Sequence, residues 1–206
     1  MFYNKVRKSI LIYFVFFYHV IFCSYAYSFS EIEEKSIQKT LNYFLSIKTI
    51  KGEFVQNDIN GHKIRGEFYM ARPSKFYFKY SDPPYKYIIS DGSNIALYNG
   101  KLENWSVYSL SSTAFSIIFS EKWDDLYKGI QGIETNDSFV TIVFGKSQTE
   151  NLVSLTFSKP LYRLVNWKIF DDSGGDTSVE ILKYKKNVVI PPQLFVIPYD
   201  RIHELE

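Results

Sequence analysis

Polar and apolar side chains alternate along most of the chain from residue 50 onward, which is the pattern of β-strands with one buried face. Turn dipeptides such as Asp91-Gly92 and Asn99-Gly100 separate successive runs. We therefore predict one antiparallel sheet of about ten to eleven strands. Twelve runs are candidates for these strands: residues 50–58, 62–71, 75–81, 85–90, 94–98, 101–108, 129–135, 139–144, 152–158, 165–170, 177–184 and 194–197.

Two segments have helical spacing instead. In the first, residues 30–47, Ser30 is placed to cap the helix and Glu33 to complete a capping box. Its apolar stripe consists of Ile37, Leu41, Phe44 and Leu45. The second, residues 111–122, predicts a helix of about three turns. Its apolar side chains are Phe115, Ile118 and Phe119, with Ile117 beside them.

The first 28 residues have the composition of an export signal. A basic start precedes an apolar run over residues 10–22, and cleavage fits equally well after Ala26 or after Ser28. The alternative is an uncleaved anchor, but the apolar run is shorter than the roughly 18 to 20 residues that a bilayer span needs. We predict a secretory signal peptide over residues 1–28 and one domain over residues 29–206.

Removing this segment changes the charge of the chain. The full sequence has 24 Lys and Arg against 22 Asp and Glu, and the mature chain keeps 21 against 22 because the first 28 residues hold three bases and no acid. Near-neutral net charge is not typical of proteins that bind nucleic acid, or of proteins that bind a membrane surface through a basic patch. Cys23, the only cysteine, lies in the removed segment, and the large Phe22 before it disfavours lipid attachment. The hydrophobic core alone must therefore hold the exported domain.

The sequence offers little for catalysis. His62 lies beside a turn and His203 lies in a polar tail, so a His/Cys metal site would need atypical ligands. The acid pairs Asp124-Asp125 and Asp171-Asp172 could be read as general acid/base pairs, but adjacent residues in a strand point to opposite faces, and the pair next to Gly174-Gly175 is more simply a solvated turn. No phosphate loop or nucleophile elbow is present. We predict no enzymatic activity, no metal and no cofactor.

Aromatic residues are abundant, with 18 Phe and 17 Tyr, but coding bias explains the total as well as function does. Their position on strands is more informative. Phe68, Met70 and Arg72 follow one another at period two, which places a guanidinium at the rim of an apolar strand face. Because arginine keeps its charge, Arg72 needs oxygen acceptors or water there. Arg72 is thus either a latch or an ordinary surface residue.

Several runs together resemble the LolA family of periplasmic lipoprotein carriers. They are GEFVQ at residues 52–56, GEFYMARP at 66–73, FYF at 76–78, IISDG at 88–92 with LY at 97–98, and FVIP at 195–198. The sequence departs from the family pattern at Asn99-Gly100, where a proline-containing turn is frequent, and at Thr113-Ala114, where the lid helix often opens with Thr-Pro. These departures leave the bounds of the lid helix open.

The resemblance implies a fold and a role. The fold is a curved antiparallel sheet that forms an incomplete, half-open barrel, covered by an N-terminal helix and a short lid helix, with a hydrophobic cavity between. The role is that of a monomeric periplasmic chaperone. It would take lipoproteins from an inner-membrane ABC transporter of the LolCDE type and carry their acyl chains to an outer-membrane acceptor of the LolB type or a substitute.

In that role, Arg72 is the latch that bonds the sheet to carbonyl groups of the lid helix in the empty state. The implied acyl-chain-binding residues are Phe68, Met70, Phe76, Phe78, Ile117, Ile118 and Phe119. The alternative for these apolar residues is plain core packing. A second function also stays open, a non-catalytic lipid- or lipoprotein-sensing module of the same half-barrel fold.

Overall fold

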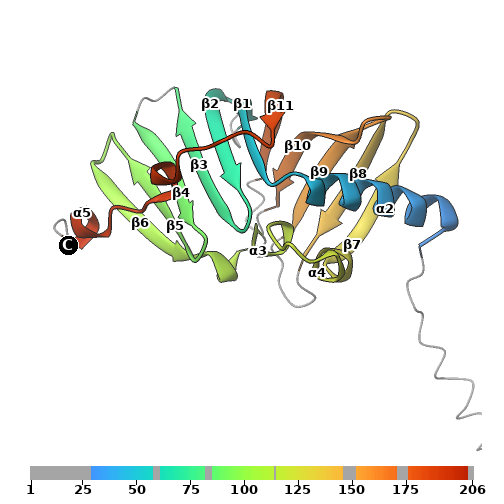
Figure 1. The fold of residues 1–206 in the computed structure, drawn as a ribbon. Helices are drawn as coiled ribbons and strands as arrows, with labels where there is room; N and C mark the ends of the chain where they lie inside the picture. Colours follow the sequence, from blue (N-terminus) through green and yellow to red (C-terminus); the bar gives the residue numbers. More distant parts are fainter. Residues whose placement is uncertain are drawn as a thin grey trace, which may run out of the picture. The chain divides into compact units, whose positions relative to one another are not determined.

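The alternating pattern folds into one antiparallel sheet of 11 strands, in the order β6-β5-β4-β3-β2-β1-β11-β10-β9-β8-β7 (Figure 1). The computed structural model describes residues 29–57, 61–81, 85–113, 115–145, 152–170 and 176–203. The predicted fold class, an open curved sheet with a few helices, is confirmed. The strands are β1 (Thr49–Asn57), β2 (Lys63–Ala71), β3 (Lys75–Tyr80), β4 (Lys86–Asp91), β5 (Asn94–Asn99), β6 (Asn104–Ser109), β7 (Ile130–Thr135), β8 (Phe139–Phe144), β9 (Val153–Ser158), β10 (Arg163–Ile169) and β11 (Thr177–Lys186).

The sheet consists of two meanders, β1 to β6 and β7 to β11, joined by the pairing of β1 with β11. The chain separates into the units Met1–Ser30 and Glu31–Glu206, and this sheet belongs to the second. The predicted signal peptide, with Cys23 and both cleavage positions, lies outside the described residues. Within the described part of the chain, no helix is both long and apolar enough to cross a membrane.

Helix α2 (Glu31–Ser46) covers one face of the sheet, called here the inner face, and confirms the predicted N-terminal helix. It runs across β7, β8 and β9 (Figure 1) and contacts β7 and β8. Ile37 and Leu41 of the predicted stripe have no exposed surface. Phe44 packs edge-on against Phe157 of β9, with ring centroids 5.7 Å apart. The apolar stripe therefore fixes which face of the sheet is closed to water.

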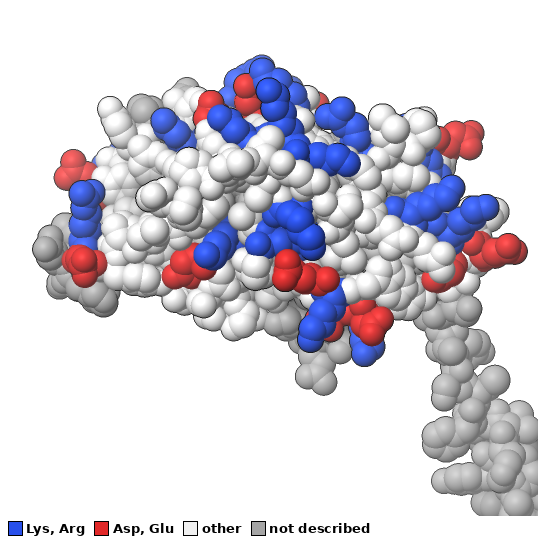
Figure 2. Space-filling view, viewed as in Figure 1, with Lys and Arg blue, Asp and Glu red and all other residues white. Residues whose placement is uncertain are grey.

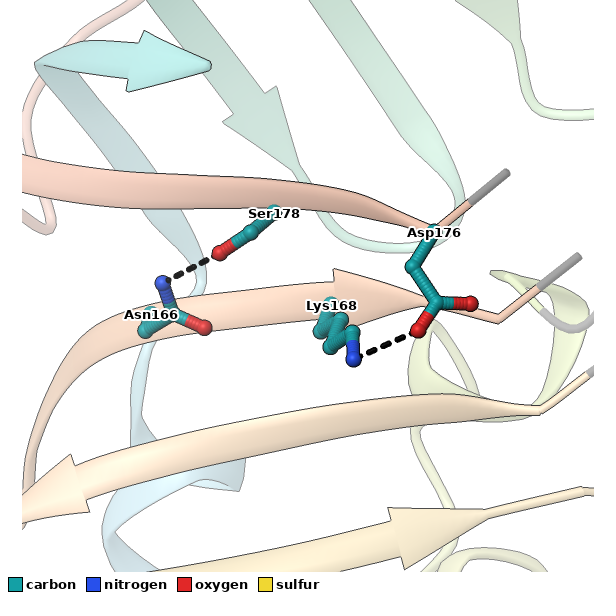
Figure 3. Close-up of polar contacts among 4 residues, drawn as sticks. All are labelled: Asn166, Lys168, Asp176 and Ser178. Atoms are coloured by element: carbon teal, nitrogen blue, oxygen red, sulfur yellow. Dashed lines mark hydrogen bonds and ion pairs between the residues drawn. The ribbon is translucent and has the colours of Figure 1, made fainter. Parts of the chain in front are cut away.

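Side chains on the opposite, outer face are polar on β10 and β11. Figure 3 shows Asn166 donating to Ser178 Oγ at 3.1 Å, and Lys168 Nζ 2.6 Å from the carboxylate of Asp176. Trp167, between the two β10 residues, is 5% exposed and packs on the inner face. Adjacent side chains of β10 thus point to opposite faces of the sheet, one toward solvent and the next toward the core, as in any pleated strand.

The predicted helix over residues 111–122 is wrong in its extent. The segment divides into η1 (Leu110–Ser112) and α3 (Phe115–Ile118), and a further helix α4 (Trp123–Lys128) follows. The hydroxyl groups of Thr113 and Ser116 donate to backbone carbonyls three residues earlier, at 2.8 Å and 2.9 Å. Such local bonds give the backbone an alternative to one continuous helix. Ala114 lies outside the described residues.

Helix α4 contains the acid pair Asp124 and Asp125. The two acids lie in its first turn and Lys128 lies in its last turn, so their charges interact favourably with the helix dipole. Trp123 stacks on Tyr127, one turn later, with ring centroids 4.7 Å apart. The Tyr127 hydroxyl donates to the Glu34 carboxylate of α2 at 2.9 Å. α4 is therefore held to α2.

The predicted strand over residues 194–197 is also wrong. The segment forms η2 (Pro192–Phe195), and α5 (Tyr199–His203) follows, so His203 ends a helix. Pro191 and Pro192 have no backbone N–H to donate to a sheet ladder. The segment instead crosses the outer face of β3 and β4 (Figure 1). A buried cluster joins it to the sheet and consists of Ile89, Ala96, Ile197 and Ile202.

Two glycine positions on the inner face of β1 and β2 accommodate aromatic rings. Gly52 lies opposite Phe68, and Gly66 lies opposite Phe54. A Cβ atom on Gly66 would lie 2.5 Å from Phe54 Cζ and 2.5 Å from the Lys79 carbonyl oxygen. A Cβ on Gly52 would lie 2.6 Å from Phe68 Cε1. Each ring therefore occupies the space that a side chain on the opposite strand would take.

We predict that Gly66→Ala destabilises the fold by about 1 to 3 kcal/mol, because the backbone of β3 must move to admit the methyl group. Gly132→Ala is the matched control, since a Cβ at this β7 position meets nothing within 4 Å. It should change the free energy of unfolding by less than about 0.5 kcal/mol. Urea unfolding followed by circular dichroism measures both, and equal effects would contradict the packing argument.

Candidate functional site

An apolar cavity of ≈ 510 Å³ lies on the inner face of the sheet. Its wall comes from both meanders, since β3, β4 and β5 face β10 and β11 across it. Residues from η1 and the turn after it close one side. The lining residues are Phe54, Gln56, Phe76, Phe78, Tyr80, Lys86, Ile88, Ile95, Leu97, Tyr108, Ser112, Thr113, Val153, Trp167, Ile169, Thr177 and Val179.

The predicted lining residues divide between the cavity and its surroundings. Phe76 and Phe78 line the cavity directly. Phe68 is fully buried behind them and stacks on Phe78, with centroids 5.9 Å apart. Met70 lines a second, smaller cavity of ≈ 30 Å³ that also touches Arg72 and Phe119. Phe68 thus supports the wall and does not form its surface.

The segment after η1 packs beside the cavity through aromatic stacking, although neither Ile118 nor Phe119 lines the cavity itself. Phe119 is 3% exposed and stacks on Phe76, with centroids 5.2 Å apart and rings inclined by 21°. Ile118, also 3% exposed, is the last residue of α3. The side chain of Ile117 lies outside the described part of the chain. We call residues 110–120 the cover segment.

Arg72 joins the cover segment to the sheet and to α2. Its Nη1 donates to the carbonyl oxygens of Ser120 at 2.7 Å and Ile118 at 3.4 Å, and its Nε donates to the Ile47 carbonyl at 3.2 Å. Ile118 ends α3 and Ile47 follows α2, so the acceptors are carbonyl groups that helix ends leave without intrahelical partners. The Arg72 backbone N–H donates to Lys48 O at 2.9 Å, which fixes the strand beside the same helix end.

The guanidinium of Arg72 is largely buried but stays charged. Burial lowers the pKa of Arg72 to about 10, and the nearby charge of Glu121 opposes this shift. The guanidinium is therefore protonated at neutral pH. It also lies over the Phe44 ring, 4.5 Å from the centroid, so the cation meets an aromatic face as well as carbonyl oxygens.

A polar corner interrupts the apolar lining where β1, β3 and β4 meet. Tyr80 is 4% exposed, and its hydroxyl donates to Gln56 Oε1 at 2.7 Å. Burial raises the pKa of Tyr80, so its phenol stays neutral. Lys86 Nζ lies over the Tyr80 ring, 4.6 Å from the centroid. We call Gln56, Tyr80 and Lys86 the polar corner.

Sequence reasoning missed much of the wall. Ile95 and Leu97 of β5, and Trp167 and Ile169 of β10, were predicted only as strand residues, although all four line the cavity. Their period-two spacing is the same signal that identified Phe76 and Phe78. What the pattern lacked was the pairing of β1 with β11, which brings the second meander opposite the first.

The described residues do not form a metal site. Among the described residues, no group of three His, Cys, Asp or Glu is placed to hold a metal ion. Asp171-Asp172 lies outside the described residues. Over the face shown in Figure 2, Lys and Arg side chains gather mainly in the upper part of the view, and Asp and Glu side chains lie mostly at its edges and lower side.

A family model described as outer membrane lipoprotein carrier protein LolA matches residues 45–198, a range that includes every strand from β1 to β11. The chain belongs to the LolA family. The match contains Arg72, the cover segment and every lining residue of the cavity. The site therefore lies within the part of the chain that defines the family.

Relatives of this LolA-family chain are distant. An outer-membrane lipoprotein carrier protein from Legionella pneumophila (strain Paris) is 26% identical over 203 residues, which cover 92% of this chain and 94% of that protein. An uncharacterized protein from Rickettsia prowazekii (strain Madrid E) is 26% identical over 133 residues, 64% of this chain and 62% of the relative, so the chain spans less than two thirds of it. The crystal structure of an uncharacterized conserved protein from Thermus thermophilus shares the fold, with a TM-score of 0.50 and 12% identity over 81% of this chain and 95% of that one.

We predict that Phe76→Glu weakens binding of the neutral dye Nile red roughly tenfold, because the carboxylate must lose water or draw water into the cavity. Desolvation raises the pKa of this new carboxyl group, so binding should recover as the pH falls below that raised pKa and the group becomes neutral. Lys79→Glu is the control, because Lys79 is exposed on the same strand. Dye fluorescence measures both variants, and equal binding would show that the dye does not enter this cavity.

Proposed function

We propose that this LolA-family protein is a non-catalytic periplasmic carrier that binds the acyl chains of lipoproteins released from the inner membrane and takes them to an outer-membrane acceptor. The observation that carries the proposal is an apolar cavity whose cover segment is held by Arg72 through neutral carbonyl acceptors. The name of the Legionella relative, an outer-membrane lipoprotein carrier protein, supports it.

The cost of exposing lipid explains why such a carrier needs this cavity. Each methylene group moved into water costs about 0.8 kcal/mol, so one palmitoyl chain costs on the order of 11 kcal/mol. A lipoprotein with several chains cannot cross an aqueous compartment at that cost. A wall of Phe, Ile, Leu and Trp side chains removes most of it.

The size of the cavity indicates that the cover segment moves during loading. An apolar cavity of about 150 Å³ accepts a benzene ring, so ≈ 510 Å³ accommodates roughly 20 carbon atoms. That is one long acyl chain. A cargo with more chains must displace the cover segment, and displacement breaks the bonds from Arg72 to Ile118 and Ser120. Loading of such a cargo and breaking of the Arg72 hydrogen bonds then occur together.

The partners follow from this route. We infer an inner-membrane ABC transporter of the LolCDE type as the source of cargo and an outer-membrane acceptor of the LolB type, or a substitute, as its destination. The carrier acts as a monomer. The broken latch re-forms when cargo leaves, which favours release to the acceptor.

A reconstitution assay tests the carrier function. Inner-membrane vesicles with the cognate transporter, a radiolabelled lipoprotein and ATP should yield a lipoprotein–carrier complex in the supernatant. Omission of ATP, or of the carrier, should leave all lipoprotein in the vesicles. If lipoprotein stays membrane-bound in the complete mixture while the purified protein still binds Nile red, the protein is a lipid-sensing module and not a carrier.

We predict that Arg72→Leu accepts cargo at least as well as the wild type but releases it more slowly. The substitution removes charge-assisted bonds worth about 1.5 to 3 kcal/mol in total, which shifts the closing equilibrium roughly 10- to 150-fold toward the open state. Arg65→Leu is the control, because Arg65 is exposed on the same strand. Uptake from vesicles and transfer to acceptor membranes are measured separately. Wild-type transfer by Arg72→Leu would show that Arg72 is not a latch.

A further inference from the structure

The cavity reaches solvent at one edge of the sheet. Tyr108 of β6 lines the cavity and is 55% exposed, and Ser112 of η1 lines the cavity and is exposed as well. All other lining residues are buried or half-buried. Tyr108 shares its face of the sheet with its β5 partner Ile95, which also lines the cavity. The mouth of the cavity therefore lies along β6 and the start of the cover segment.

Strand β6 is an edge with little protection against pairing. It lies at one end of the strand order, and no described strand other than β5 pairs with it (Figure 1). Its sequence NWSVYS has no charge and no proline, and its register with β5 is unbroken. The edge strand at the other end, β7, has a register shift between Ile130 and Gly132, carries Glu134 and is contacted by α2. Charges and bulges keep edge strands from pairing, and β6 has neither.

The backbone groups of alternate β6 residues face away from the sheet. The Leu110 N–H donates to the Ser93 carbonyl at 2.9 Å, where β6 leads into the cover segment. Hydrogen-bonded and non-hydrogen-bonded pairs alternate along an antiparallel ladder, so the residue before Leu110, and every second residue before that, turn away from β5. These residues are Trp105, Val107 and Ser109. Each directs one N–H and one carbonyl group toward the free edge, where a further strand can bond to them.

The position of this edge at the cavity mouth indicates which strand binds there. In the proposed function, on which this inference rests, the cavity holds an acyl chain. An acyl chain that enters past Tyr108 brings the polypeptide attached to it alongside β6. Backbone groups bind an extended strand without reading its side chains, and β6 has no charge that would exclude a charged neighbour. Such an edge suits polypeptides of varied sequence.

We propose that β6 binds, as an additional strand, the extended polypeptide segment that adjoins the lipid of an acylated protein. The acyl chain lies in the cavity, and the segment bonds to the backbone of Trp105, Val107 and Ser109. The peptide bonds add to the affinity that the acyl chain provides. The folded part of the cargo stays outside the cavity, beyond the β6 edge.

Four palmitoylated probes test the peptide contribution: the glycine amide, an uncharged hexapeptide, and the same hexapeptide with N-methyl groups on its odd or on its even residues. Displacement of Nile red gives each affinity. The plain hexapeptide should bind roughly tenfold more tightly than the glycine amide, the factor expected for one or two net hydrogen bonds. One methylation pattern should lose this gain because it removes the N–H groups that face β6, and the other should keep it.

The same displacement assay separates this proposal from the carrier function. Equal affinity of the hexapeptide and the glycine amide, with the dye displaced by both, would overturn strand addition and leave the carrier function intact. Retention of the gain by both methylated peptides would also overturn strand addition. If no probe displaces the dye, strand addition and the carrier function fail together.

Val107→Pro removes an N–H that faces the free edge but none that bonds to β5, and edge strands tolerate proline at such positions. Because Val107 does not line the cavity, the variant should bind the glycine amide like the wild type and lose the gain from the hexapeptide. Val107→Ala, the matched control, loses the same side chain but keeps the N–H and should keep the gain. A full gain in Val107→Pro would overturn the assignment to β6.

Hydrogen exchange followed by NMR tests the edge in the wild-type protein, without a variant that has to fold. The palmitoylated hexapeptide should slow exchange of the Trp105, Val107 and Ser109 amides more than the glycine amide does. Equal exchange with both probes would overturn the proposal. Sedimentation equilibrium tests the other occupant of an edge strand, a second copy of this chain. A dimer that Val107→Pro converts to a monomer would show that β6 pairs with itself, and would overturn the peptide assignment.

Discussion

A half-buried guanidinium has to find oxygen acceptors, and this constraint on Arg72 organises the closed state. Its acceptors are three backbone carbonyl groups, from Ile47, Ile118 and Ser120, and not a carboxylate. A buried ion pair that loses one partner costs about 3 to 5 kcal/mol, whereas a neutral carbonyl that is uncovered takes up water readily. Neutral acceptors therefore make a contact that holds the cover segment but is easily opened. The same bonds satisfy the open ends of α2 and α3.

The strength of this contact also sets how tightly the protein holds what it binds. If closure is favoured by about 1.5 to 3 kcal/mol, the open form makes up roughly 0.6 to 7% of the empty protein. The apparent affinity for a cargo that requires the open form falls by the same factor.

Local pattern was enough to predict most of the sheet, because each strand alternates on its own. The ends of β8 at Phe139 and Phe144 are as predicted, and period two alone placed Arg72 at the rim of an apolar strand face, without deciding its role. The cover segment was mispredicted because Ser and Thr hydroxyl groups divide it, and because Arg72, about 46 residues away in the chain, binds its carbonyls. The cavity wall from β10 and β11 depends on the pairing of Ile50 with Lys186, which no local pattern contains.

The crossed pairs Gly52–Phe68 and Gly66–Phe54 have a consequence for how this sequence can change. Each ring fills the space over the glycine of the other strand, so the ring and any side chain at that glycine would compete for the same space. A larger residue at either glycine is compatible with the fold only if the ring opposite becomes smaller. The four positions are therefore coupled across the β1–β2 ladder, but a smaller ring relieves only part of the clash, because the backbone carbonyls of Lys183 and Lys79 also crowd a Cβ at Gly52 and Gly66.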